Sequence, residues 1–294
     1  MAVILITGCS SGLGLASALA FARNGDQVYA TMRDTNKAGP LEQIVEQETL
    51  EIHIKALDVS RPATFKGVVE EIIGEARHID VLVNNAGILR AGAFEDLTEQ
   101  TIREVMETNF FAPMLLTREI LPYMRAQNSG YIIMISSLSG VAGLAGDVSY
   151  TGSKFALEGA TEALRHEVDR WGIKVALVQA ALYETNIFSP SLPTGSILPG
   201  DYPTDSPYRT LVETKLEDLR NRLPDALDPG IIGDLLVTIA ASGGSQLRWP
   251  ADDLSKSVLD ALFAQTDEDR DSFLRGAAGT DWWSEGKAGP GCVL

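Results

Sequence analysis

The chain has 294 residues, of which 45% are hydrophobic and 22% charged, the balance of an ordinary globular protein. Its formal net charge of -16 argues against a nucleic-acid or anionic-membrane partner, because either would need a basic face. No apolar run reaches the ~18 residues of a membrane span. A signal peptide is not visible, and two cysteines cannot build a disulfide framework. These observations predict a cytoplasmic protein.

The first apolar run is followed at once by a glycine-rich turn. Residues 3–6 have the length of a buried strand, and an apolar helical pattern continues to residue 21. Strand, glycine turn and helix form the context of a dinucleotide-phosphate site, although a purely structural turn is the alternative. The spacing, with three residues and then one between the glycines, differs from the commoner G-x-G-x-x-G. The predicted pyrophosphate cradle comprises Gly8, Ser10, Ser11, Gly12, Leu13 and Gly14.

A second strand is predicted over residues 27–32, and Arg33 follows it. An acidic side chain at the end of this strand would bind the ribose hydroxyls of NAD. A guanidinium there suits a 2′-phosphate, which favours NADP(H) as the cofactor. The alternatives are an arginine exposed to solvent in a loop, or an arginine paired with Asp34.

Two further strands, predicted over residues 51–57 and 79–83, end in polar groups. Asp58, followed by Val59, is placed to accept from an adenine amino group. It is equally suited to be the N-cap of a helix near Pro62, and both roles can hold together. The strand at residues 79–83 is followed by two asparagines, Asn84 and Asn85, and then by Ala86 and Gly87. These residues, Asn85 included, are predicted to line the cofactor crevice and to tie adjacent strands together, although a simple turn is the alternative.

Over residues 99–125, apolar and polar residues alternate at the spacing of a helix, which Pro113 is expected to interrupt. Asn109 lies inside this apolar segment and needs buried partners there. One explanation for Asn109 is that it binds a water molecule that stabilises a kink in the helix. The other is that it takes part in a proton relay.

The stretch with the most chemical content runs from residue 131 to residue 160. A strand ends in Ser136 and Ser137, and a helix then opens just before Tyr150. Tyr150 and Lys154 stand four apart and share a helix face. A phenol titrates near pH ~10, and a nearby ammonium favours its anion, so we expect Lys154 to lower the pKa of Tyr150. Such a tyrosine can act as general acid/base at a carbonyl or alcohol oxygen, which Ser137 could also bind.

The alternation of apolar strands and helices, with a sixth strand over residues 173–179, predicts an α/β fold. We expect a single Rossmann-type, doubly wound parallel sheet with helices on both faces. One domain is predicted over residues 1–266, with a lid at about 186–225, because that segment opens with a long aperiodic stretch. Tyr183 and Glu184 could face substrate or solvent. Residues 267–294 form an acidic, then glycine-rich tail.

Taken together and in order, these motifs resemble the short-chain dehydrogenase/reductase family along residues 3–185, and more loosely to about 264. Within it, the segments around residues 30–34 and 150–159 look most like the hydroxysteroid and retinol dehydrogenase branch. The resemblance implies that Tyr150 is the acid/base and that Lys154 binds the nicotinamide ribose. It also implies that Ser137 orients the substrate oxygen, Asn109 maintains a water relay and Thr185 meets the nicotinamide. One departure is Ala180-Ala181, where the family usually has Pro-Gly.

The predicted function is interconversion of a secondary alcohol and a ketone or aldehyde with NADP(H). The apolar lid and the branch likeness favour a small molecule that is bulky and hydrophobic, such as a steroid or retinoid. One alternative is a non-redox relative that uses the tyrosine for elimination or dehalogenation, although such proteins tend to lose the glycine loop. Another is a cofactor-sensing binding protein without turnover. The three histidines lack ligand spacing, so no metal site is expected. The family resemblance implies a homodimer or homotetramer.

Overall fold

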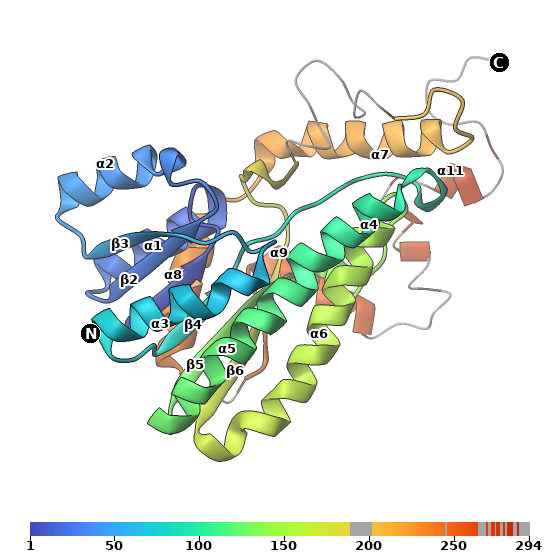
Figure 1. Cartoon of the computed structure of the whole chain (residues 1–294). Coiled ribbons are helices and arrows are strands. Elements are labelled where there is room, and N and C mark those ends of the chain that lie inside the picture. The colour runs from blue at the N-terminus through green and yellow to red at the C-terminus, as the bar shows by residue number, and fades with distance from the viewer. Residues whose placement is uncertain are drawn as a thin grey trace.

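A computed structural model describes residues 1–188, 202–244 and 246–263, together with short pieces between 269 and 287. Seven parallel strands form one sheet in the order β3-β2-β1-β4-β5-β6-β7 (Figure 1). The order reverses direction beside β1, so the crevice at the carboxyl ends of β1 and β4 is the place where open α/β sheets bind ligands. The strands are β1 (Val3–Thr7), β2 (Gln27–Met32), β3 (Ile52–Ala56), β4 (Val81–Asn84), β5 (Gly130–Ser137), β6 (Ile173–Ala180) and β7 (Arg248–Pro250).

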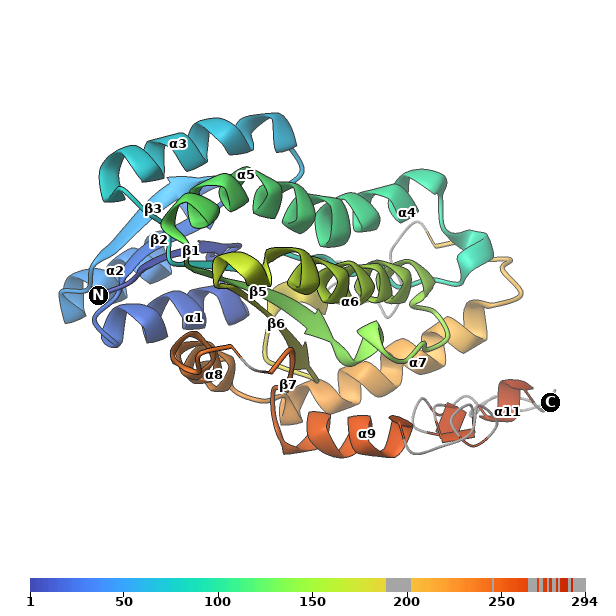
Figure 2. The same cartoon turned by 90° about the horizontal axis from the view of Figure 1, so that it is seen from below.

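Helices cover both faces of this sheet, as Figure 2 shows. One face packs on α1 and α8, and the opposite face packs on α3, α5 and α6. Both faces of β1 and β4 are therefore buried, which explains their unbroken apolar runs. The helices are α1 (Gly12–Arg23), α2 (Gly39–Glu48), α3 (Phe65–Ala76), α4 (Glu99–Met106), α5 (Ala112–Gln127), α6 (Val148–Val168), α7 (Arg209–Arg222), α8 (Gly230–Ala241), α9 (Asp253–Phe263) and α11 (Asp281–Ser284).

The long helical segment is interrupted earlier than the sequence predicts. A π-helical turn over Glu107–Phe111 separates α4 from α5, and Pro113 lies in the first turn of α5. Proline is tolerated there because the first turn has no intrahelical use for its missing N–H. The break between α4 and α5 is therefore at the π turn and not at Pro113, and the π turn contains Asn109. π turns of this kind often mark functional sites.

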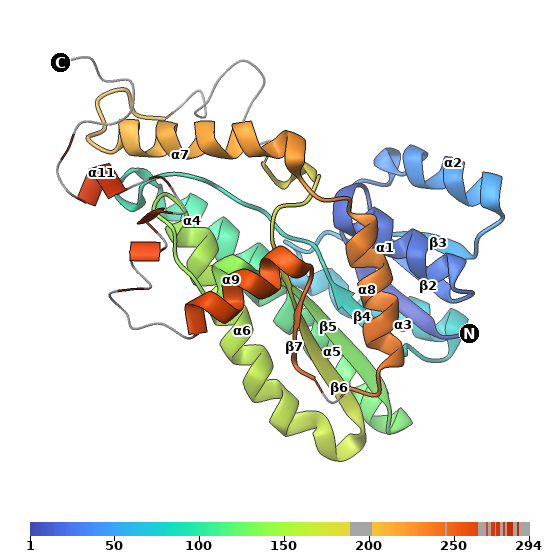
Figure 3. The same ribbon diagram turned by 180° about the vertical axis from the view of Figure 1, so that it is seen from behind.

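The lid predicted at about 186–225 is described only in part, since residues 189–201 lie outside the described residues. Its helix, α7, lies across one end of the molecule above the N-terminal end of α6 (Figures 1 and 3). Most of the tail predicted at 267–294 also lies outside the described residues. Within the part that is described, no helix has the length and apolar character needed to cross a membrane.

Candidate active site

The turn after β1 forms a cradle that only glycine permits at its tightest point. A Cβ built at Gly14 would lie 2.3 Å from the Gly8 carbonyl oxygen and 2.5 Å from Asn85 Nδ2. Gly12 begins α1, whose first turn has no acidic residue. The oriented N–H groups of that turn suit an anion. The predicted cradle residues therefore lie together, and their shape fits a dinucleotide pyrophosphate.

Two side chains join this cradle to the end of β4. Asn85 Nδ2 donates to the carbonyl oxygens of Thr7 (2.8 Å) and Gly8 (3.3 Å). Thr7 Oγ1 accepts from the backbone N–H groups of Asn85 and Ala86, both at 3.0 Å. The expectation that asparagine amides tie these strand ends together is confirmed. Thr7 was missed as a contributor, although its place directly before the first glycine is a readable signal.

Arg33 is exposed just beyond β2. Asp34 does not pair with it. Asp34 Oδ1 accepts from the backbone and the side chain of Asn36, at 3.1 and 2.9 Å, and thereby caps a short 3-10 turn. Among the described residues no ion pair to Arg33 is found, so its guanidinium remains available to an anionic ligand.

Asp58, beyond β3, is not the helix N-cap that was one of its two predicted roles. The N-cap of the turn at Pro62 is Arg61, and no side chain caps that turn. Asp58 Oδ1 instead accepts from the backbone N–H and hydroxyl of Ser60 at 3.0 and 2.7 Å. Aspartate often forms such a local turn because its short side chain reaches the backbone two residues ahead. The adjoining Val59 is half-buried.

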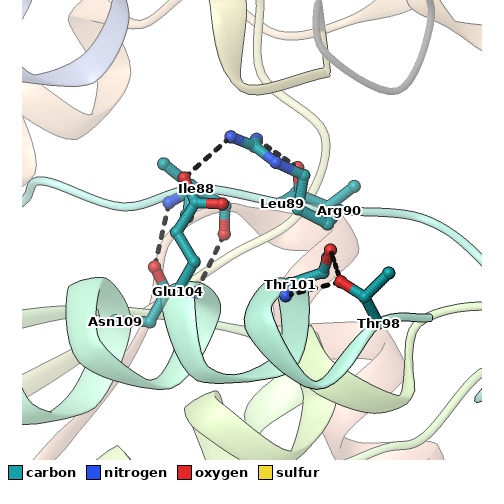
Figure 4. A network of polar contacts seen from close by, with 7 residues as sticks. All are labelled: Ile88, Leu89, Arg90, Thr98, Thr101, Glu104 and Asn109. Atoms are coloured by element: carbon teal, nitrogen blue, oxygen red, sulfur yellow. Dashed lines mark hydrogen bonds and ion pairs between the residues drawn. The ribbon is translucent and has the colours of Figure 1, made fainter. Parts of the chain in front are cut away.

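Asn109, in the π turn, binds the strand-end loop after β4 (Figure 4). Its Oδ1 accepts from the Ile88 N–H, and its Nδ2 donates to the Ile88 carbonyl, both at 2.9 Å. The same Nδ2 donates to Ser153 Oγ on α6 at 3.0 Å. The predicted need for buried partners is met by these protein groups. They connect the loop after β4 to the helix that carries Tyr150.

Tyr150 and Lys154 lie on the buried face of α6, beneath the end of β5. Lys154 Nζ donates to the Ile135 carbonyl oxygen at 2.7 Å and lies 5.7 Å from the centre of the Tyr150 ring. Ser137 shares a side-chain hydrogen bond with Tyr150. A Cβ built at Gly87 would lie 3.4 Å from Asn109 Oδ1 and 4.0 Å from Lys154 Nζ. Asn109 and Lys154 thus meet at Gly87, while Tyr150 lies beside Lys154 and is hydrogen-bonded to Ser137.

The pKa of Tyr150 does not move in the expected direction. Burial raises it to about 12, a hydrogen bond with Ser137 lowers it, and the nearby carboxylate of Asp147 raises it. Burial also lowers the pKa of Lys154 to about 8, against an opposing influence of Glu158. Desolvation disfavours both charged forms and outweighs the attraction between them. The predicted effect of Lys154 is therefore not what determines the proton affinity of Tyr150 in this structure.

The segment after β6 is anchored despite its unusual Ala180-Ala181 pair. Tyr183 is buried and donates to Asp252 Oδ2, at the start of α9, at 2.6 Å. Neither of the two alternatives for Tyr183 is therefore correct, whereas Glu184 is exposed to solvent. A Cβ built at Gly12 would lie 3.1 Å from the Thr185 side chain. Thr185 thus reaches the glycine cradle.

A small apolar cluster surrounds Tyr150 on the side facing α7. Tyr202 and Tyr208, from the segment that precedes α7, donate to Asp96 Oδ2 at 2.5 Å and to Glu95 Oε2 at 2.8 Å. These bonds fasten the described part of the lid to the loop after β4. The buried members of the cluster are Leu89, Ala91, Ala93, Tyr150, Tyr202, Val212 and Leu216. Tyr150 is therefore part of an apolar cluster, which sequence periodicity did not reveal.

The described residues contain no cluster of histidine, cysteine or acidic side chains able to bind a metal. Buried Cys9, inside the glycine turn, donates its thiol to the Ile6 carbonyl oxygen at 3.4 Å. Burial raises its pKa to about 12, which leaves the thiol protonated and unreactive.

Residues 2–194 match the family described as short chain dehydrogenase. The chain belongs to the short-chain dehydrogenase/reductase family. Enzymes of this family are NAD(P)-dependent oxidoreductases, and the predicted family and Rossmann-type fold are both confirmed. An uncharacterized oxidoreductase of Bacillus subtilis, YusZ, is 35% identical over 251 residues, which are 84% of this chain and 88% of that protein.

Two further relatives match a shorter part of the chain. The 3-ketodihydrosphingosine reductase of Bacteroides thetaiotaomicron is 41% identical over 62% of this chain and 64% of its own length. Retinol dehydrogenase 8 of Bos taurus is 37% identical over 60% of this chain and 57% of its own length. This chain therefore shares less than two thirds of the length of either relative. The likeness to the retinol and hydroxysteroid branch is confirmed.

Solved structures agree with this placement. A short-chain dehydrogenase from Streptomyces avermitilis superposes with a TM-score of 0.77 at 29% identity, covering 95% of this chain and 98% of the other. A metagenomic short-chain oxidoreductase in complex with NADP gives a TM-score of 0.66 at 26% identity, covering 85% and 95%. The sheet order and helix arrangement of this chain are therefore those of its family.

Proposed function

We propose that this protein is an NADP(H)-dependent oxidoreductase that interconverts a secondary alcohol with a ketone, or acts on an aldehyde. The observation that carries the proposal is that Lys154 and Asn109 meet at Gly87, beside the glycine cradle, with the Tyr150 ring centre 5.7 Å from Lys154 Nζ. An acid/base pair next to a dinucleotide-shaped crevice is suited to hydride chemistry coupled to proton transfer.

The cofactor would lie along the carboxyl edge of the sheet. Its hydride chemistry is supplied by the nicotinamide when it is bound. Arg33 would bind the 2′-phosphate, because its exposed guanidinium has no ion-pair partner in the described part of the chain. The metagenomic relative in complex with NADP supports this preference. The residues proposed to hold the rest of the cofactor are Gly8, Ser10, Ser11, Gly12, Leu13, Gly14, Asp58, Val59, Asn85, Ala86, Gly87, Tyr150, Lys154 and Thr185.

Proton transfer at the substrate oxygen is the task of Tyr150. Its phenol donates a proton during carbonyl reduction and accepts one during alcohol oxidation, while Ser137 holds the same oxygen in place. The pKa of Lys154, about 8 through burial, is near neutrality, so its amine can exchange protons under working conditions. Asn109 fixes the loop after β4 against α6 and thereby keeps these groups in position.

The proposed substrate is hydrophobic, since the cluster that surrounds Tyr150 is made of apolar and aromatic side chains. Two of the relatives described above are named for bulky lipophilic substrates, a long-chain keto base and retinol. A long-chain or polycyclic carbonyl compound therefore fits both the site and the branch of the family.

At the level of the whole chain, we propose that residues 1–266 form one catalytic unit and that the protein acts as a homodimer or homotetramer in the cytoplasm. Phe111, at the end of the π turn before α5, and Phe155, on α6, are 42% and 43% exposed. Large apolar side chains at this exposure are suited to burial between subunits.

Binding and turnover of the purified chain test the proposal. NADPH should bind more tightly than NADH in a fluorescence titration, and the protein should reduce 3-ketodihydrosphingosine or all-trans-retinal faster than a small polar ketone such as acetone. Tyr150→Phe should lower kcat by at least ~1,000-fold, because the proton donor is lost, while the dissociation constant for NADPH changes less than about threefold.

Tyr123→Phe is the matched control, since Tyr123 lies on α5 away from the site. It should leave kcat and NADPH affinity unchanged. Near-normal turnover by Tyr150→Phe would remove Tyr150 from the mechanism. A wild-type chain that binds neither cofactor would overturn the redox function itself.

A further inference from the structure

A buried ion pair joins the lid helix to the start of the helix that carries Tyr150. Lys215 Nζ, on α7, contacts Asp147 Oδ2 at the N-cap of α6. The two side chains are only 12% and 10% exposed. Water and salt screen such a pair little, so each charge acts strongly on its surroundings. The position of α7 and the electrostatics at the start of α6 are therefore linked.

Asp147 does not act as an ordinary helix cap. It occupies the N-cap position of α6, yet its side chain accepts no capping hydrogen bond. Its Oδ1 atom is buried and has no hydrogen-bond partner among the residues that the structure describes. A buried carboxylate requires compensation. Within the described part of the chain, that compensation comes from Lys215.

The backbone beside this pair accommodates the lysine. Gly146 has φ +79°, and a Cβ built there would lie 3.2 Å from Lys215 Cδ. An L-residue at this position would meet both backbone strain and the lysine side chain. The Gly146 carbonyl oxygen also accepts from the Gly92 N–H at 2.9 Å, which ties the loop after β4 to the same corner. The loop at Gly146 thus leaves room for the Lys215 side chain, and the loop after β4 is bonded to it.

Other polar groups near Tyr150 come from four elements. Lys154 shares its helix, and Ser137 faces it from β5. In the loop after β4, Arg90 is paired with Glu104 of α4 at 3.2 Å (Figure 4). From the lid, Tyr202 and Ser206 donate to Asp96. The charge that acts directly against ionisation of Tyr150 is that of Asp147.

We infer that Lys215 is a positioning residue for the proposed reaction, on which this inference rests: docked with α7, it compensates the charge of Asp147 and lets Tyr150 release its proton. The direction follows from the local electrostatics. The Asp147 carboxylate raises the pKa of Tyr150. Without the ammonium of Lys215, that carboxylate acts at full strength and the phenol holds its proton more tightly.

The test is the pH profile of Lys215→Met, a substitution of similar length without the charge. In alcohol oxidation with NADP⁺ and retinol, or whichever panel alcohol the wild type oxidises, kcat/KM should rise with pH toward the deprotonated tyrosine. We expect Lys215→Met to move the apparent pKa of this profile upward by about one unit and to lower kcat/KM below that pKa about tenfold.

Rescue separates this effect from a loss of packing. Lys215→Arg should keep the wild-type profile, and Asp147→Asn/Lys215→Met should return the apparent pKa to the wild-type value because it removes both charges. Arg222→Met, which breaks the exposed pair with Asp218 on the same helix, should change nothing. An unchanged apparent pKa in Lys215→Met, or no rescue by the double variant, would overturn the inference.

A second readout needs neither cofactor nor substrate. Ionisation of Tyr150 can be followed by tyrosinate absorbance in rapid pH jumps, as the difference between each variant and the same variant carrying Tyr150→Phe. The midpoint should be higher in Lys215→Met than in wild type. An equal midpoint would refute the inference even if the protein were active. An inactive wild type with a shifted midpoint would instead reject the proposed function alone.

Discussion

At the scale of single residues, burial has more influence on the site than charge pairing. Tyr150 and Lys154 share a helix face, but desolvation raises the pKa of the phenol to about 12 and lowers that of the amine to about 8. Arg33 presents the opposite situation. It is exposed, and its acidic neighbour Asp34 is engaged with Asn36. A ligand phosphate is therefore the partner that its position suits best.

Arg33→Asp should reverse the cofactor preference. Loss of a charge-assisted hydrogen bond, together with repulsion of the phosphate, should lower kcat/KM with NADPH by about 10- to 100-fold. The value with NADH should change less, since NADH lacks the phosphate. Steady-state kinetics with both cofactors measure the ratio. Arg170→Asp makes the same charge change near Trp171, away from the glycine cradle, and should leave the ratio as it is. An unchanged ratio in Arg33→Asp would show that another group recognises the phosphate.

At the scale of secondary-structure elements, irregular backbone in this site is held by side chains from distant segments. The π turn between α4 and α5 is held by Asn109 against the loop after β4. The chain after β6, where Ala180-Ala181 stands in place of the family's Pro-Gly, is held by Tyr183 against Asp252. Leu227 pairs with this segment as well, through Leu182 and Glu184. These anchors replace rigidity that a proline would have provided locally.

Tyr183→Phe tests that anchor. Removing a buried hydroxyl that donates to a carboxylate should lower the free energy of unfolding by about 1.5–3 kcal/mol. It should also weaken NADPH binding several-fold, because Thr185 lies two residues further along, and its side chain is 3.1 Å from the position of a Cβ built at Gly12. Denaturant unfolding and fluorescence titration give the two values. Tyr123→Phe removes a hydroxyl with no hydrogen bond among the described residues and should alter neither. If Tyr183→Phe also altered neither, the hydroxyl of Tyr183 would not be the anchor of this segment.

At the scale of the whole molecule, two of the exposed phenylalanines of the described residues lie on one helical layer, whereas Phe94 and Phe263 lie elsewhere. Phe111 lies in the π turn before α5, and Phe155 lies on α6. Both belong to the helical layer that also supplies Asn109 and Tyr150. Assembly of subunits through this layer would stiffen the elements that position the acid/base residues. Phe263, at the end of α9, is more exposed still, but it belongs to a different part of the molecule.

Phe111→Lys/Phe155→Lys should shift the protein toward single chains in analytical ultracentrifugation. Each aromatic side chain withdrawn from an interface forfeits about 2 kcal/mol, or ~30-fold in the dissociation constant. Phe263→Lys makes the same type of substitution at one position outside this layer and should leave the mass of the assembly unchanged. If the double variant sediments like the wild type, the subunit interface either lies on another surface or does not exist.

The sequence by itself determined the sheet, the glycine cradle and the spacing of Tyr150 and Lys154, because each follows from a local pattern of strand, turn or helix. Strand ends were predicted to within about two residues for the same reason. Only the tertiary structure decided which side chains face one another across distant segments. The π turn at Asn109, the partners of Asp34, Asp58 and Tyr183, and the pairing of Lys215 with Asp147 all depend on such contacts. Desolvation, too, is a property of the assembled core, so the raised pKa of Tyr150 could not be read from a four-residue spacing.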